Sequence, residues 1–241
     1  MTYCVGLLLN EGMVMLSDTR TNAGLDNIST YRKMFFFEAP GEKVIAIMTA
    51  GSLSVTQTTI ARLQEAVEDP DSTEETSILK APTMLKVASI IGDMLARVRG
   101  EIDEKLQGMR QAATASLIVA GQRKGGPMRM FLVYPEGNFI QATEDTPFLQ
   151  IGEHKYGKPI LDRVVTPATC LADAQKAVLL SMDSTLRSNL SVGMPLDMCV
   201  IEKDALKVGA TRRIEAGDEQ FRAMSEAWSK ALRDGFAQID I

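Results

Sequence analysis

The first ten residues decide how the rest of this chain is interpreted; they read Met1-Thr2-Tyr3-Cys4-Val5-Gly6-Leu7-Leu8-Leu9-Asn10. The apolar run after Thr2 predicts a buried strand. If Met1 is removed, which the small side chain of Thr2 permits, Thr2 carries a hydroxyl beside a free α-amine whose pKa is about 7.7–8.0. Nucleophile and base then share one residue, as in covalent catalysis by an N-terminal threonine. The alternative is an ordinary strand in a chain that happens to begin Met-Thr.

Composition limits the class of protein. The chain has 241 residues, is 45% hydrophobic and carries a net charge of −5, which suits a globular α/β protein with a sizeable core. No stripe of Lys and Arg is present, so we expect no nucleic-acid or anionic-membrane partner. The N-terminal apolar run is too short for a signal peptide, and no window approaches a transmembrane helix. The sequence therefore predicts a cytoplasmic protein.

Cysteine and histidine are too sparse for a zinc site. Cys4, Cys170 and Cys199 form no CxxC pair, and His154 is the single histidine. We predict three reduced, buried thiols, a surface position for His154, and no metal or cofactor. Without a second histidine or a Gly-x-Ser-x-Gly run, a conventional serine hydrolase is disfavoured.

The order of predicted elements indicates an α+β fold of two face-to-face antiparallel sheets with helices outside. Expected strands cover 2–9, 13–17, the end of 28–37, 43–50, 113–121, 128–134, 139–142 and 195–201, with 205–208 as a hairpin partner of the last. Expected helices start near 52 and 83 and cover about 155–165, 171–190 and 217–237. No linker interrupts this order, so one domain over 1–241 is expected. The C-terminal helix either covers the chain's own core or packs on a neighbouring subunit.

An N-terminal threonine nucleophile needs three supports, and the sequence offers a candidate for each. A cation would keep the amine neutral, a carboxylate would hold that cation, and a backbone N–H would face the developing oxyanion. Lys33 lies on the predicted third strand, Asp18 ends the second, and Gly51 lies where a strand gives way to a helix. Taken singly, each has a plainer explanation: a solvated strand lysine, a turn aspartate and a tight-turn glycine.

Together these residues resemble a known family. Thr2, the Ser17-Asp18-Thr19-Arg20 run, Lys33 and Thr49-Ala50-Gly51 are similar to the proteasome β-subunit pattern of N-terminal nucleophile hydrolases. The N-terminal stretch as a whole most resembles the Anbu (ancestral β-subunit) proteins, which are bacterial proteasome-type proteases. The resemblance covers essentially the whole chain. It implies a four-layer αββα sandwich, a threonine peptidase acting on peptides or unfolded proteins, and a homo-oligomeric ring or spiral.

The resemblance also implies roles for individual residues. Thr2 would be the nucleophile with its amine as base, Lys33 would tune that amine, Asp18 would orient Lys33, and Gly51 would donate to the oxyanion. The family pattern has a serine after a glycine in the second half, where this chain has Glu153, and an Asp-x-x-Ser pair, of which Ser191 matches the serine while Ser188 replaces the aspartate. These departures bear on the level of activity.

The resemblance further implies a specificity pocket, formed by Thr21, Tyr31, Phe35, Thr49 and Leu53. Tyr31 and Phe35 suit an apolar or mid-sized substrate residue before the cut bond. Three functions follow as hypotheses: a threonine peptidase, an N-terminal nucleophile amidase acting on small amides, and a self-assembling scaffold with little turnover. No P-loop is present, so any unfolding motor would be a separate protein.

Overall fold

The computed structural model describes residues 1–22, 28–106 and 113–240. This part of the chain forms five helices and three antiparallel sheets, which confirms the predicted mixed α+β class. One five-stranded sheet has the order β10-β1-β2-β11-β12, with bounds Phe148–Gly152, Tyr3–Leu8, Gly12–Asp18, Leu196–Glu202 and Thr211–Ile214. The other has the order β5-β6-β7-β8-β9, with bounds Met34–Ala39, Lys43–Gly51, Ala115–Arg123, Arg129–Val133 and Phe139–Gln141. A two-stranded sheet pairs β3 (Arg20–Asn22) with β4 (Ile28–Thr30).

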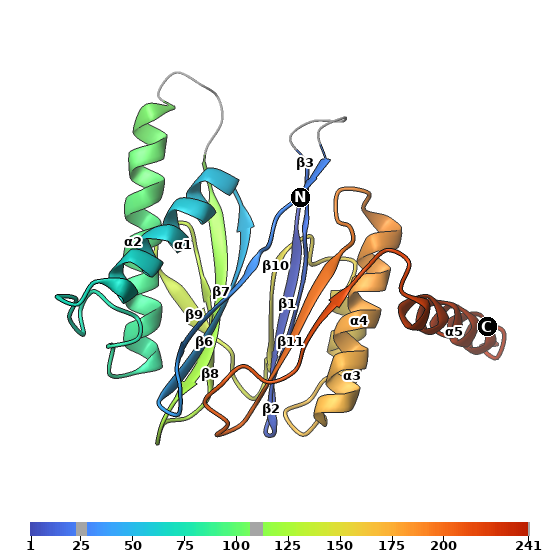
Figure 1. Ribbon diagram of the computed structural model, residues 1–241. Coiled ribbons are helices and arrows are strands. Elements are labelled where there is room, and N and C mark those ends of the chain that lie inside the picture. Colours follow the sequence, from blue (N-terminus) through green and yellow to red (C-terminus); the bar gives the residue numbers. More distant parts are fainter. Residues whose placement is uncertain (23–27, 107–112, 241) are drawn as a thin grey trace.

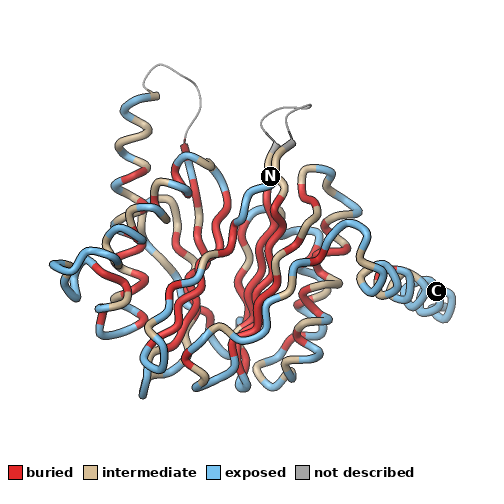
Figure 2. The backbone as a smooth tube through the Cα atoms, viewed as in Figure 1, coloured by how far each residue is buried: buried red, intermediate tan, exposed pale blue. Residues whose placement is uncertain are grey.

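Apolar residues divide into three clusters, which define how the layers pack. Helices α1 (Leu53–Glu68) and α2 (Met84–Lys105) cover one face of the β5–β9 sheet, and α3 (Lys158–Val164) and α4 (Leu171–Ser188) cover one face of the sheet that contains β1 (Figure 1). A third cluster joins the two sheets and contains Met13, Met15, Met34, Met48 and Met130. Unbranched methionine adapts to irregular gaps, which suits the space between two twisted sheets. Figure 2 shows the buried strands at the centre and more exposed helices outside.

The first hairpin fixes the position of the chain's start. β1 pairs with β2 on one side, with Cys4 opposite Ser17, and with β10 on the other, with Tyr3 opposite Gly152. β2 in turn pairs with β11, placing Asp18 opposite Leu196. Thr2 and Asp18 therefore lie at the same end of two neighbouring, central strands.

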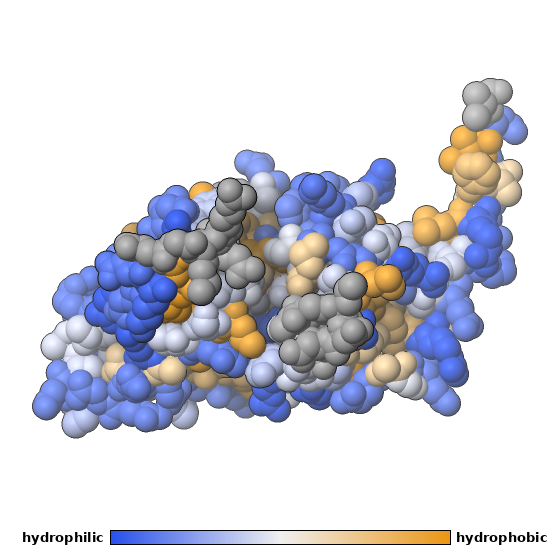
Figure 3. Space-filling view, turned by 90° about the horizontal axis from the view of Figure 1, so that it is seen from above, coloured by the Kyte–Doolittle hydropathy of each residue, from blue (hydrophilic) through white to orange (hydrophobic). Residues whose placement is uncertain are grey.

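The C-terminal helix α5 (Glu219–Phe236) lies where a helix was expected over about 217–237. Asp218 caps it by accepting a hydrogen bond from the Phe221 N–H at 2.8 Å. Ser225 is its one buried residue and bonds Asp183 of α4 at 2.7 Å. The rest of α5 projects from the body, with apolar side chains showing near its end (Figure 3).

Two sequence predictions that concern residues outside the site were wrong. Residues 205–208 do not form the hairpin partner of β11, because Asp204 and Leu206 have positive φ angles of 63° and 52° and carry the chain through a loop to β12. The strand was predicted because apolar Leu206 and Val208 lie on either side of polar Lys207, an alternation typical of a strand. Cys170 is exposed at the start of α4, whereas Cys4 and Cys199 are buried as expected. His154 is exposed, as predicted.

Candidate active site

Backbone hydrogen bonds hold Thr2 on both sides. Its carbonyl oxygen accepts from the Glu153 N–H at 2.8 Å, and the N–H of the next residue, Tyr3, donates to Asp18 Oδ1 at 3.1 Å. Thr2 is 8% exposed, so its side chain is largely enclosed by these neighbours. The geometry fixes the first residue of β1 against the end of β2.

Gly152 makes this close approach possible. Its φ is +80°, a conformation that residues with a Cβ rarely adopt, and a Cβ at this position would lie 1.9 Å from the Thr2 carbonyl oxygen. Position 152 therefore requires glycine for steric reasons. The neighbouring Glu153 contributes its N–H to Thr2, at the place where the family pattern has a serine.

Lys33 and Asp18 form a buried ion pair beside Thr2. Lys33 Nζ donates to Asp18 Oδ1 at 2.7 Å and to the Arg20 carbonyl at 2.7 Å; the Lys33 and Asp18 side chains are 6% and 0% exposed. The same ammonium lies 3.5 Å from the Met1 carbonyl oxygen, which belongs to the peptide group that contains the Thr2 nitrogen. The ammonium is thus held within one peptide group of the atom that becomes the α-amine when Met1 is removed.

A backbone donor from a distant part of the chain completes the carboxylate's surroundings. The Gly193 N–H donates to Asp18 Oδ2 at 3.3 Å, opposite the oxygen that binds Lys33 and Tyr3. Burial raises the pKa of Asp18, while the Lys33 ammonium and the two N–H donors oppose that rise. Sequence reasoning missed Gly193, although the Ser191-Val192-Gly193 run after α4 was a signal for a special backbone position.

Arg20 packs over this donor. A Cβ at position 193 would lie 2.2 Å from Arg20 Nε, so a larger residue here would displace the guanidinium. Arg20 Nη1 also donates to the Leu190 carbonyl at 3.0 Å. Its backbone carbonyl accepts from Lys33, so Arg20 connects the loop after α4 to the ion pair.

A cavity of about 470 Å³ opens onto Thr2. Among the predicted site residues, those that line it are Thr2, Thr21, Lys33, Thr49, Gly51 and Leu53. Gly51 ends β6 with a φ of +111°, and Ser52 at the N-cap of α1 bonds Ser54 Oγ at 3.0 Å instead of capping the helix. The first turn of α1 therefore begins at the cavity without a side-chain cap.

Four other sequence-derived positions do not line this cavity. Tyr31 is exposed, and Phe35 packs against the core beneath α1 and α2, because alternation along β5 turns it away from the second sheet. Ser191 is half-buried, and its N–H donates to Asn189 Oδ1 at 2.9 Å. Ser188 is exposed at the end of α4. The structure thus brings together Thr2, the ion pair and part of the predicted specificity pocket.

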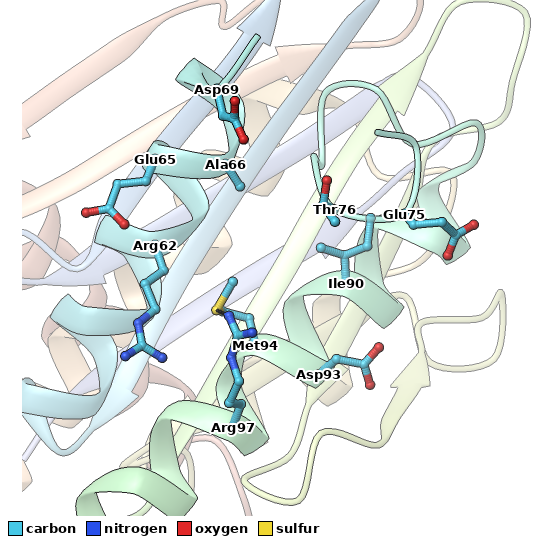
Figure 4. A pocket seen from close by; sticks show the side chains of 10 residues that line it. All are labelled: Arg62, Glu65, Ala66, Asp69, Glu75, Thr76, Ile90, Asp93, Met94 and Arg97. Atoms are coloured by element: carbon cyan, nitrogen blue, oxygen red, sulfur yellow. Dashed lines mark hydrogen bonds between the residues drawn. The ribbon is translucent and has the colours of Figure 1, made fainter. Parts of the chain in front are cut away.

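A larger cavity, of about 620 Å³, lies between α1, α2 and the loop that joins them (Figure 4). Charged side chains of both signs surround it, including Arg62 and Glu65 of α1, Arg97 of α2, and Glu75 of the loop. It shares no lining residue with the cavity at Thr2. Residues 1–22, 28–106 and 113–240 contain no cluster of His, Cys, Asp and Glu suited to a metal ion. Nor does a helix in these ranges have the length and apolar character needed to cross a membrane.

Comparison with known proteins identifies the family. No protein-family model matches the chain, and no curated protein does. Among solved structures, a Gly-1 mutant of Anbu from Hyphomicrobium sp. strain MC1 is 46% identical, with a TM-score of 0.94 over 100% of this chain and 99% of that one. The chain belongs to the Anbu family.

Two further Anbu structures agree. Anbu from Yersinia bercovieri is 41% identical, with a TM-score of 0.91 over 99% of this chain and 98% of that chain. The helical assembly of the Anbu complex from Pseudomonas aeruginosa is 42% identical, with a TM-score of 0.93 over 99% and 97%. This Anbu chain is therefore a full-length match to its relatives, and the predicted resemblance is confirmed. The relationship makes the chain a proteasome-subunit-like protein.

Proposed function

We propose that this chain is a threonine-type peptide hydrolase whose nucleophile is the hydroxyl of Thr2, exposed by removal of Met1. The observation that carries the proposal is the buried Lys33–Asp18 ion pair, whose ammonium lies 3.5 Å from the peptide group that joins Met1 to Thr2. A cation beside an amine lowers the amine's pKa, which favours the neutral, proton-accepting form. The cavity at Thr2 gives a substrate access to the hydroxyl.

Besides the peptide and one water, the proposed reaction uses only groups of this chain. The α-amine of Thr2 takes the hydroxyl proton as Oγ attacks the scissile carbonyl carbon. The Gly51 N–H, at the end of β6 where the residue lines the cavity, would donate to the oxyanion. Collapse expels the amine product, which receives the proton from the α-ammonium, and leaves an ester on Thr2. The same amine then deprotonates a water, which attacks the ester carbonyl; the bond to Thr2 Oγ breaks, Oγ takes the proton back from the α-ammonium, and the acid leaves.

The assembly is part of the proposal. The two sheets with their outer helices support a single domain of the αββα type over 1–241 (Figure 1). A Pseudomonas aeruginosa relative forms a helical assembly, which favours a homo-oligomer for this chain as well. The projecting α5, with exposed Leu232 and Phe236, is a candidate contact between subunits.

A scaffold with little turnover is the second candidate, and a specific observation favours it. Two side chains that support the amine in the family pattern are replaced here: Glu153 contributes only its backbone N–H to Thr2, and Ser188 is exposed. A particle assembled from such subunits would retain the fold without an efficient base.

Intact-mass spectrometry and covalent labelling separate these candidates. We expect the purified protein to lack Met1 and to react with a peptide epoxyketone or β-lactone, and Thr2→Ala to lose both labelling and hydrolysis of fluorogenic peptides. A matched control is Thr49→Ser, which keeps a hydroxyl in the same cavity. Retained Met1, or equal labelling of Thr2→Ala, would exclude the mechanism. Processed protein that assembles but neither labels nor cleaves would establish the scaffold, and cleavage of small amides alone would indicate an amidase.

A further inference from the structure

A third cavity, distinct from the two described above, adjoins the candidate active site along the open edge of the sandwich. It has a volume of about 300 Å³ and is lined by Arg32, Met34, Phe36, Asp197, Met198, Thr211, Arg212 and Arg213. These residues come from the end of the β4–β5 connection, from β5, from β11 and from β12. Both β5 and β12 are edge strands, one in each five-stranded sheet. We call this cavity the edge groove.

Strand register places the edge groove next to the Lys33–Asp18 ion pair. Lys33 lies between two residues that line the groove, Arg32 and Met34. On the other sheet, Leu196 pairs with Asp18, and the next residue, Asp197, lines the groove. Arg32 also lines the cavity at Thr2, so one side chain borders both spaces. An extended peptide lying at Thr2 could therefore continue past Arg32 into the groove.

The groove has an apolar wall that the chain leaves uncovered. Along β5, Phe35 and Phe37 pack beneath α1 and α2, while Met34 packs between the sheets. Phe36 shares the inter-sheet side with Met34 by alternation, yet it is 36% exposed. With Met198 across the groove, it offers a surface for an apolar side chain of a ligand.

The charge of the groove favours an anionic ligand. Three guanidinium groups and one carboxylate line it. Arg213 is paired with Asp197 at 3.3 Å and with Glu215 at 3.2 Å, and Arg212 with Asp218 at 2.8 Å. Arg32 is exposed and forms no ion pair with any residue in the described ranges. Its guanidinium is thus the cation with capacity for a new carboxylate, which arginine binds through two parallel N–H donors.

We infer that the edge groove is a substrate subsite that selects peptides with an acidic side chain next to an apolar one, and that Arg32 is its specificity-determining residue. The inference rests on the proposed peptidase function, because it assigns the substrate class of the same site. The acidic side chain pairs with Arg32 at the border of the two cavities. The neighbouring apolar side chain lies against Phe36 and Met198.

Peptides that differ only in charge test the inference. A set of fluorogenic peptides carries Glu or the isosteric Gln at each position around the cut bond, and mass spectrometry locates the cut. At one position we expect Glu to raise kcat/KM over Gln by roughly tenfold, as for a charge-assisted bidentate pair. Arg32→Gln should reduce that ratio to about one, and Arg32→Glu should reverse it. Arg163→Glu, an exposed site on α3, makes the same change in net charge and should keep the ratio.

Binding to Thr2→Ala separates failure of the subsite from failure of the chemistry. Fluorescence anisotropy of labelled Glu and Gln peptides on this variant requires no turnover, and we expect the same roughly tenfold preference for Glu. If the wild type cleaves nothing but the Glu peptide binds more tightly in an Arg32-dependent way, the peptidase proposal fails and the groove remains an acidic-peptide site. Equal affinities and rates for Glu and Gln at every position, or a Glu preference unchanged in Arg32→Glu, would overturn the inference.

Discussion

Replacing Asp18 by Asn isolates the contribution of the buried ion pair. The substitution keeps the shape of the side chain but leaves the Lys33 ammonium in a 5% exposed position, facing only carbonyl oxygens. Removing one partner of a buried pair costs about 3–5 kcal/mol of unfolding free energy. Asn also offers one acceptor oxygen where the carboxylate offers two, so the N–H of Tyr3 or Gly193 loses its partner.

This loss should be large enough to measure directly. At about 2.1 cal/mol/K per residue, 241 residues give an unfolding entropy near 0.5 kcal/mol/K. A loss of 3–5 kcal/mol then lowers Tm by about 6–10 °C. Guanidinium unfolding at fixed protein concentration, followed by fluorescence and circular dichroism, measures the same quantity at 25 °C. Intact mass must show the same N-terminus in every sample, because Met1 itself contacts Lys33.

A double-mutant cycle with Lys33→Met decides whether the pair is responsible. If the ammonium and the carboxylate stabilise each other, the double variant should be less destabilised than the sum of the single variants, by at least about 2 kcal/mol. Both single variants should also lose electrophile labelling at Thr2. Free energies that add within about 0.5 kcal/mol would refute the reasoning, because they would mean that the two charges act independently.

Three further outcomes are expected. Gly152→Ala should abolish labelling and lower the free energy of unfolding by more than about 2 kcal/mol, because its Cβ would collide with the Thr2 carbonyl oxygen. Gly41 also has a positive φ but lies in open space, so Gly41→Ala should cost only about 1–2 kcal/mol. Equal costs for the two variants would contradict the clash. Burial raises the pKa of Tyr3 to about 12. The neutral Tyr3 hydroxyl therefore adds about 3 kcal/mol to the free energy of unfolding below pH 10, and this contribution is lost as pH rises through 12. Ultraviolet titration should show one of the four tyrosines ionising last, and Tyr3→Phe should remove that step. The backbone N–H of Phe221 holds the pKa of Asp218 below its usual range, so the α5 cap is present at neutral pH and lost as pH falls below about 3.9. Asp218→Ala removes the acceptor for both the Phe221 N–H and Arg212, so it should weaken α5 docking at neutral pH, and emission of the single tryptophan, on α5, should report it.

The sequence predicted the parts of the fold that depend on local periodicity. The first hairpin and the helices near 53 and 84 were predicted because their apolar residues repeat with a clear strand or helix period. The false strand over 205–208 had such a period without the backbone to support it, since positive φ at Asp204 and Leu206 is decided by the surrounding loop. Alternation likewise could not say which face of β5 borders the cavity, so Phe35 was placed in a pocket that it does not line.

At the site, Thr2, Lys33 and Asp18 come together as predicted, and backbone groups hold two of them in place. Lys33 and Asp18 could be proposed because an N-terminal threonine nucleophile needs a cation near its amine and a carboxylate to hold that cation. The donors from Gly193 and Glu153 could not, because every residue but proline has a backbone N–H and only the fold selects which ones point at Asp18 and at the Thr2 carbonyl. The indirect signal was glycine itself, at positions 152 and 193, where a Cβ would collide with a neighbour.

Because backbone groups provide this support, the replacement of the family's aspartate by Ser188 should have little effect on the site. Ser188, which stands where the family pattern has an aspartate, is exposed at the end of α4, and Arg20 bonds the Leu190 carbonyl while packing over Gly193. The loop after α4 is therefore still tied to the ion pair, through Arg20 and through the Gly193 N–H on Asp18. Because these ties need only a guanidinium, a carbonyl and a glycine, the position of Lys33 beside Thr2 does not depend on the side chain at 188. Ser188→Asp should consequently change the rate of Thr2 labelling far less than Gly193→Ala does. A larger effect from position 188 would show that side chains, and not the backbone of this loop, determine how Thr2 is held.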